Sequence, residues 1–170
     1  MGFNGPQSPL LIGSLTASNS ATISFTNISP GYSSYFLLVS NVVPITAGDN
    51  LQMLVNTGSG YIVTNYLSGV NRIAYNATSI TNTHSTTAFL LSGPISTSVN
   101  YYAKFRMYNA SNGQPVSIVG LCSYQDNASG VMVGGMIAGT NTATNITAIQ
   151  FACSTGNISS GVFSLYATYS

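Results

Sequence analysis

Apolar and polar positions alternate in short runs along the chain, and Gly, Asn, Ser and Pro separate these runs. Ala21–Thr26 alternates cleanly, and Asn100–Tyr108 alternates again with aromatic and aliphatic residues on one face. A period of two residues is typical of a half-buried β-strand. We find no window with the spacing of three and four residues that predicts an amphipathic helix. The pattern therefore predicts an all-β chain.

The runs predict about ten to twelve strands at intervals of roughly 8–15 residues. They cover Leu10–Leu15, Ala21–Thr26, Tyr35–Val43, Leu51–Val55, Tyr61–Leu67, Val70–Tyr75, Ala88–Leu91, Asn100–Tyr108, Val116–Tyr124, Gly130–Ala138, Ile146–Cys153 and Val162–Tyr169. Ser68-Gly69, between two of these runs, is a two-residue hairpin signal. Thr78–Thr87 is expected to form a polar loop.

Strand spacing of this kind is typical of a β-sandwich or a β-barrel. By itself it leaves a jelly roll, an immunoglobulin-like sandwich and an up-and-down barrel open. The chain is longer than an immunoglobulin-like module of roughly 100 residues, and it has no Trp for the core of one. We therefore expect a jelly-roll-type antiparallel β-sandwich of eight strands with extra edge strands. No linker divides the chain, so we predict one domain over 10–170 that follows an extended N-terminal arm, 1–9.

Charged residues make up only 3% of the chain, against roughly 25% in typical soluble domains. They are Asp49, Arg72, Lys104, Arg106 and Asp126, and there is no Glu. The lack of clustered Lys and Arg argues against nucleic-acid binding. The longest apolar runs are too short to cross a bilayer, so no membrane segment is expected. Weak charge repulsion between copies suits a subunit that is packed within an assembly.

The shortage of charged residues leaves few side chains for catalysis, for metal binding or for holding a cofactor. We expect none of the three. Asp49 and Asp126 occupy turn-like sequences, where a carboxylate accepts hydrogen bonds from backbone N–H groups. The single histidine, His84, is expected to be a solvated loop residue, and no nucleophile-elbow motif accompanies it. Cys122 and Cys153 lack the spacing of a metal or redox motif. Two buried free thiols are the favoured interpretation, with a disulfide as the alternative.

The segment Asn100–Tyr108 carries the local feature that most indicates binding. Tyr102, Lys104, Arg106 and Tyr108 share the strand face opposite its apolar residues. Aromatic rings can stack on sugars or on guanidinium groups, and an exposed cation–π contact contributes about 0.5–1 kcal/mol. These four residues are therefore the candidate site for a partner or a glycan. The alternative is that they pack against a neighbouring strand or subunit.

Short motifs at both ends of the chain follow one another in a recognisable order. They are Ser20–Phe25, Tyr32 and Tyr35 leading into Phe36–Val39, Pro44, Gly48, Leu51–Val55, Ile146–Phe151, and a Ser-Thr-Gly-Asn turn before Ser160–Tyr166. This order of strands and turns resembles the jelly-roll domains of tailed-bacteriophage virion proteins, found in tail fibres, baseplates or head decoration. The resemblance implies a homotrimer located in the virion, in contact with major capsid or tail proteins. It supplies no catalytic residues.

Two functions follow as expectations. The first is a structural virion protein, of capsid decoration, cement or tail-fibre type, that acts by self-association and by binding to the particle. The second is a receptor- or carbohydrate-binding β-sandwich module, for which a host-surface glycan would be the ligand. Neither is an enzyme.

Overall fold

A computed structural model of the chain describes residues 8–29, 31–32 and 34–168, and most of the predicted arm 1–9 lies outside them. The described residues form strands and no helix. The strands are β1 (Leu10–Ser20), β2 (Ile23–Phe25), β3 (Ser34–Pro44), β4 (Leu51–Asn56), β5 (Tyr66–Ala74), β6 (Thr81–Ser85), β7 (Phe89–Leu90), β8 (Tyr101–Tyr108), β9 (Val116–Gln125), β10 (Met132–Asn141), β11 (Ala148–Cys153) and β12 (Ile158–Thr168).

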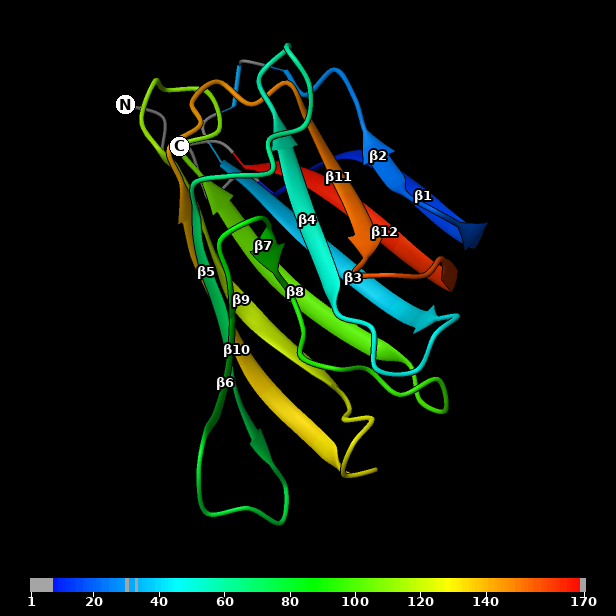
Figure 1. The fold of residues 1–170 in the computed structure, drawn as a ribbon. Helices are drawn as coiled ribbons and strands as arrows, with labels where there is room; N and C mark the ends of the chain where they lie inside the picture. The colour runs from blue at the N-terminus through cyan, green and yellow to red at the C-terminus, as the bar shows by residue number, and fades with distance from the viewer. Residues whose placement is uncertain (1–7, 30, 33, 169–170) are drawn as a thin grey trace.

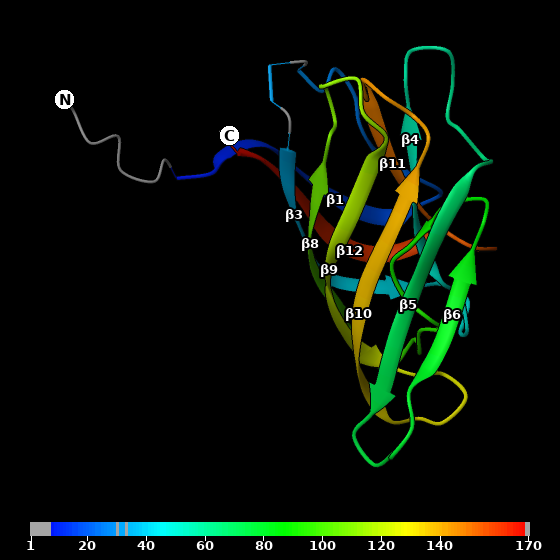
Figure 2. The same cartoon turned by 90° about the vertical axis from the view of Figure 1, so that its left-hand side faces the viewer.

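These strands form two antiparallel sheets that pack as a sandwich (Figure 1). The larger sheet has eight strands in the order β1-β12-β3-β8-β9-β10-β5-β6, and the smaller has four in the order β2-β11-β4-β7. Figure 2 shows β9, β10, β5 and β6 side by side at one end of the larger sheet. The all-β prediction is confirmed.

The pairing order identifies a jelly roll. β1 pairs with β12, β2 with β11, β3 with β8 and β4 with β7, so the first strands of the chain pair with the last in nested order. Such nesting is what results when one long antiparallel hairpin is rolled into two sheets, as in eight-stranded jelly rolls. The two remaining hairpins, β5–β6 and β9–β10, extend the larger sheet beyond β8. The expected jelly-roll-type sandwich with extra strands is therefore present.

The core lies between the sheets and follows from the alternating pattern. In β8 every second side chain from Tyr101 to Met107 is buried, and the residues between them are exposed. Phe151 of β11 connects the layers, because its ring centroid lies 4.8 Å from that of Phe163 in β12 and 6.4 Å from that of Phe105 in β8. Aromatic pairs at such separations add to the free energy gained by burial.

The predicted hairpin at Ser68-Gly69 is wrong, because Tyr66–Ala74 forms one continuous strand, β5. Ser68 points into the core, where its Oγ accepts a hydrogen bond of 2.8 Å from the Leu90 N–H. Gly69 lies opposite His84 of β6, and a Cβ at Gly69 would lie 3.0 Å from a backbone oxygen of β6. An inward hydrogen bond and a close approach between strands therefore account for two residues whose sequence resembles a turn.

The loop predicted over Thr78–Thr87 is also wrong in part, since Thr81–Ser85 forms strand β6. This strand lies at the edge of the larger sheet and pairs with β5. All of its side chains are exposed or half-buried, so it has no apolar face that would reveal it in the sequence. His84 is exposed, as expected, but it belongs to a strand and not to a loop.

Candidate binding face

The larger sheet turns one face towards the smaller sheet and the opposite face outwards, and we call the latter the outer face. On β3, β8, β9, β10 and β5 the outward residues alternate with buried ones. The outer face includes Phe36, Leu38, Tyr102, Lys104, Arg106, Tyr108, Val119, Leu121, Met136 and Ile73, together with small polar residues such as Ser40 and Ser123. Many of its apolar side chains are well exposed, with Leu121 50% and Met136 60% accessible.

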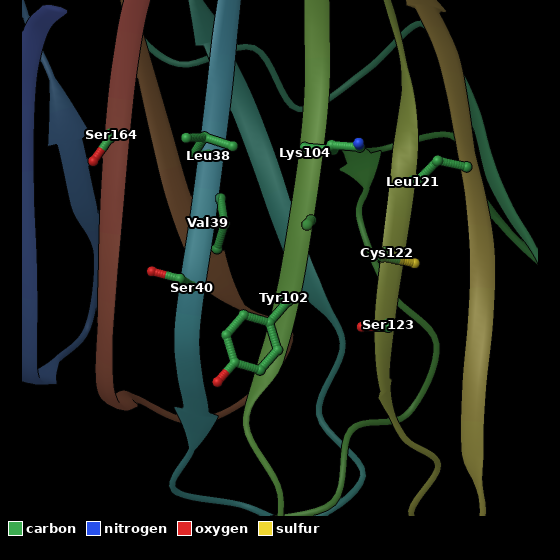
Figure 3. Close-up of a pocket in the computed structure, with 10 residues that line it drawn as sticks. Leu38, Val39, Ser40, Tyr102, Lys104, Leu121, Cys122, Ser123 and Ser164 are labelled. Atoms are coloured by element: carbon green, nitrogen blue, oxygen red, sulfur yellow. The ribbon is translucent and has the colours of Figure 1, made fainter.

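Strand register places the two basic residues of the outer face among apolar neighbours. Lys104 lies opposite Leu38 of β3 and Leu121 of β9. Figure 3 shows these three side chains in a row across β3, β8 and β9. Arg106, two residues further along β8, lies opposite Phe36 on one side and Val119 on the other. Each cation is therefore flanked by an apolar residue on both adjacent strands.

Shallow hollows cover much of this face. One of about 450 Å³ lies over β3, β8 and β9, where Leu38, Lys104 and Leu121 line it (Figure 3). A second, of about 440 Å³, lies over β10 and β5 beside Met136. A third, of about 380 Å³, follows β8 from Lys104 towards Tyr108. Leu121 lines all three, so it lies at the centre of the outer face.

All four residues selected from the sequence lie on the outer face and are exposed. The Tyr102 hydroxyl donates a 2.7 Å hydrogen bond to Asn41 Oδ1, which fixes the ring against the sheet. The Cζ atom of Arg106 lies 5.8 Å from the centroid of the Tyr108 ring, within the range of a cation–π contact.

The apolar residues around these four were not selected from the sequence. Leu38 and Leu121 belong to β3 and β9, which flank β8 on the sheet, and Met136 belongs to β10, the strand beyond β9. A signal for them exists, because β9 has apolar residues on both of its faces and a solvent-facing strand normally has them on one.

The acidic residues are held inside the structure. The Asp49 carboxylate is 2% exposed and accepts hydrogen bonds from the N–H groups of Thr155 and Gly156 and from the Ser154 hydroxyl. It therefore fixes the turn before β12 to the turn before β4. The predicted turn role is confirmed for Asp126, whose Oδ1 accepts hydrogen bonds from two backbone N–H groups of its own turn.

Asp126 has a second role that the sequence did not reveal. Its Oδ2 lies 3.6 Å from Nη2 of Arg72, and both side chains are largely buried. Arg72 also donates a 3.3 Å hydrogen bond to the Tyr124 hydroxyl, which accepts another of 2.7 Å from the Gly93 N–H. This cluster connects β5, β9 with its following turn, and the loop between β7 and β8.

Other reactive groups do not gather into a site. Cys122 and Cys153 are free and buried, so the favoured interpretation of two buried thiols is confirmed. Burial raises the pKa of each thiol to about 12, which keeps both protonated and unreactive near neutral pH. Within residues 8–29, 31–32 and 34–168, no three His, Cys, Asp or Glu side chains are grouped so as to hold a metal ion. The same part of the chain has no helix that is long and apolar enough to span a bilayer.

Comparison of the chain with protein-family models and with curated proteins gives no match.

Proposed function

We propose that the protein is a structural component of a bacteriophage virion. In this role it is a jelly-roll subunit of the capsid decoration, cement or tail-fibre type that associates with copies of itself as a trimer and attaches to other virion proteins. Its action is binding, without catalysis.

The observation that carries the proposal is the uncovered outer face. Soluble monomers rarely expose contiguous apolar patches larger than a few hundred Å², and larger patches mark interaction surfaces. Here exposed Leu38 of β3, Leu121 of β9 and Met136 of β10 lie in one row across the larger sheet, with Lys104 of β8 between the first two. Exposed Val119 lies beside Leu121 on β9. Such a face suits a subunit whose apolar residues are buried against other proteins of a particle.

A second apolar surface favours self-association. β1 is the other edge strand of the larger sheet, and its first half exposes Leu10, Leu11, Ile12 and Leu15. An edge strand with unpaired backbone groups and apolar side chains is a template for pairing with another chain. The few charges of the protein add little repulsion between copies.

Two measurements test the proposal. Sedimentation velocity of the full chain between about 1 and 200 μM should give the mass of a trimer. Antibodies against the chain should label purified virions in electron micrographs, and the position of the label separates a head location from a tail location. A monomer at every concentration, together with unlabelled virions, would contradict the proposal.

The exposed tyrosines favour a second candidate, a carbohydrate-binding module. Tyr102 and Tyr108 lie at either end of the Lys104–Arg106 pair, and both rings are more than one third exposed. A glycan array with the wild-type chain should then show binding that Tyr102→Ala or Tyr108→Ala removes. An array without binding would dismiss this candidate and leave the structural role unaffected.

A further inference from the structure

The distribution of charge separates the outer face from the rest of the molecule. Of the five charged residues, Asp49 is held by hydrogen bonds inside the fold, and Arg72 and Asp126 pair with each other. Lys104 and Arg106 are left exposed, both on the outer face. In the described part of the chain, no carboxylate forms an ion pair with either of them.

A partner that covers the apolar residues of this face must also cover these cations, because each cation lies between two apolar neighbours. Withdrawing an unpaired charge from water is strongly unfavourable, and a carboxylate that pairs with it offsets this cost. Only a partner that carries both apolar groups and negative charge can therefore bury the apolar residues and pair with the basic ones at the same time.

A second copy of the chain does not meet this condition. Both of its side-chain carboxylates are buried, with Asp49 2% and Asp126 6% exposed. Two outer faces laid against each other would place Lys104 and Arg106 of one copy near the same residues of the other. Like charges that face one another across an interface oppose association. The outer face therefore fits a different molecule.

The lining of the hollows favours a protein segment over a glycan. Leu38, Leu121, Val119 and Met136 are aliphatic and gain free energy by burial against apolar groups, which a hydroxyl-rich sugar offers sparingly. Two of the hollows adjoin along β8 and share Lys104, so an occupant would extend along that strand. Side chains two residues apart in a strand are about 6.7 Å apart, which is also the spacing of alternate side chains in an extended peptide.

We propose that the outer face binds an extended acidic segment of a different protein, whose alternate carboxylates pair with Lys104 and Arg106 while its apolar residues fill the hollows beside β8. The proposal rests on the proposed structural role and specifies the chemistry of the attachment. It assigns self-association to another surface, such as the β1 edge.

Selection from a random twelve-residue peptide library against the full chain tests the proposal. Enriched peptides should carry two Asp or Glu residues at alternate positions with apolar residues beside them. A synthetic consensus peptide should bind the K104Q/R106Q double variant at least tenfold more weakly, and raised salt should weaken its binding to the wild type. Lys104→Arg should retain affinity within about twofold, because it keeps the charge.

Matched variants distinguish peptide binding at the outer face from nonspecific hydrophobic adsorption. Leu121→Ser should weaken peptide binding, whereas Val63→Ser, at an exposed apolar position away from the outer face, should not. Circular dichroism checks that each variant is folded. Enriched peptides without carboxylates, an absence of enrichment, or equal binding to the double variant would overturn the proposal. So would specific binding of acidic glycans on an array without selected peptides.

The two proposals fail separately. If virions are labelled and the chain is a trimer, but no acidic peptide is selected, the inference about the outer face is wrong and the structural role stands. A further control replaces Leu121 by Cys and tests for copies cross-linked through the new thiol. Efficient cross-linking between outer faces would show that a second copy occupies this face, and it would overturn the inference as well.

Discussion

Gly120 of β9 lies directly opposite Phe105 of β8, and its missing side chain leaves the room that Phe105 fills. A Cβ at Gly120 would lie 2.3 Å from the Cβ of Phe105 and 2.3 Å from the Lys104 backbone oxygen. Phe105 is 1% exposed and contacts Phe151 of the facing sheet. A single glycine in one strand thus allows a large core side chain in the next.

Gly120→Ala is therefore expected to destabilise the fold by about 2–3 kcal/mol, at the upper end of overpacking effects, because one clashing atom belongs to the backbone and cannot rotate away. Gly134→Ala on the adjacent strand is the matched control, since no atom lies within 4 Å of its added Cβ. Urea unfolding of both variants measures the difference. Equal stability of the two would show that the β8–β9 pairing adjusts freely.

The Arg72–Asp126 ion pair should contribute strongly to the stability of the fold. Arg72→Met leaves the buried Asp126 without its cation and the Tyr124 hydroxyl without one donor. A buried charge that loses its partner typically costs 3–5 kcal/mol, so we expect a loss of about 3 kcal/mol in unfolding free energy. Lys104→Met makes the same change in net charge at an exposed position and should stay within about 0.5 kcal/mol of the wild type. Unfolding of both variants at the same denaturant concentration would contradict the prediction that the Arg72–Asp126 pair stabilises the fold.

The fold class was predictable because each strand carries its own alternation of apolar and polar residues. The alternation of β8 separates its buried residues from its exposed ones, and turn residues mark most strand boundaries. Strand β6 was missed because all of its residues are polar and it lies at a sheet edge. Ser68-Gly69 was misread because the same two residue types serve turns and close strand contacts, and only the neighbouring strand distinguishes them.

The candidate site was predictable only in part, for a related reason. Tyr102, Lys104, Arg106 and Tyr108 lie on one strand, so their shared face follows from a period of two residues. The apolar residues that flank them come from other strands, and strand order determines which of these are neighbours. The pairing of Arg72 with Asp126 likewise depends on the arrangement of strands, which no local pattern reveals.

Alkaline pH should destabilise the protein through its buried thiols. Burial raises the pKa of Cys122 from 9.0 to about 12, so the unfolded chain ionises at lower pH than the folded one. The thiol's contribution to stability is therefore complete below about pH 9 and falls as the pH rises towards 12, by up to about 1.4 kcal/mol per pH unit. Burial raises the pKa of the Tyr101 hydroxyl as well, which acts in the same direction.

Urea unfolding at pH 8, 9, 10 and 11 measures this dependence. Cys122→Ala removes one ionising group and should give a shallower decline than the wild type above pH 9. Equal declines of the unfolding free energy in the two proteins above pH 9 would mean that Cys122 does not contribute.

A thiol reagent tests the state of the cysteines directly. At pH 8 both cysteines should react slowly in the folded chain, and two thiols per chain should react after denaturation without reductant. Absence of reactive thiols after denaturation would indicate a disulfide.

A serine substitution should destabilise the fold much more on the inner face of β9 than on its outer face. Ile118 is 3% exposed and points into the core, whereas Leu121 is 50% exposed and points outwards. Ile118→Ser creates a cavity and buries a hydroxyl, so we expect it to destabilise the fold by about 3 kcal/mol or more. Leu121→Ser should change the unfolding free energy by less than about 1 kcal/mol, because its environment is already half solvated. Urea unfolding at submicromolar concentration, where association contributes little, makes this comparison. A loss of several kcal/mol in Leu121→Ser would mean that the outer face is needed for folding, and its exposed apolar residues would then no longer point to a partner.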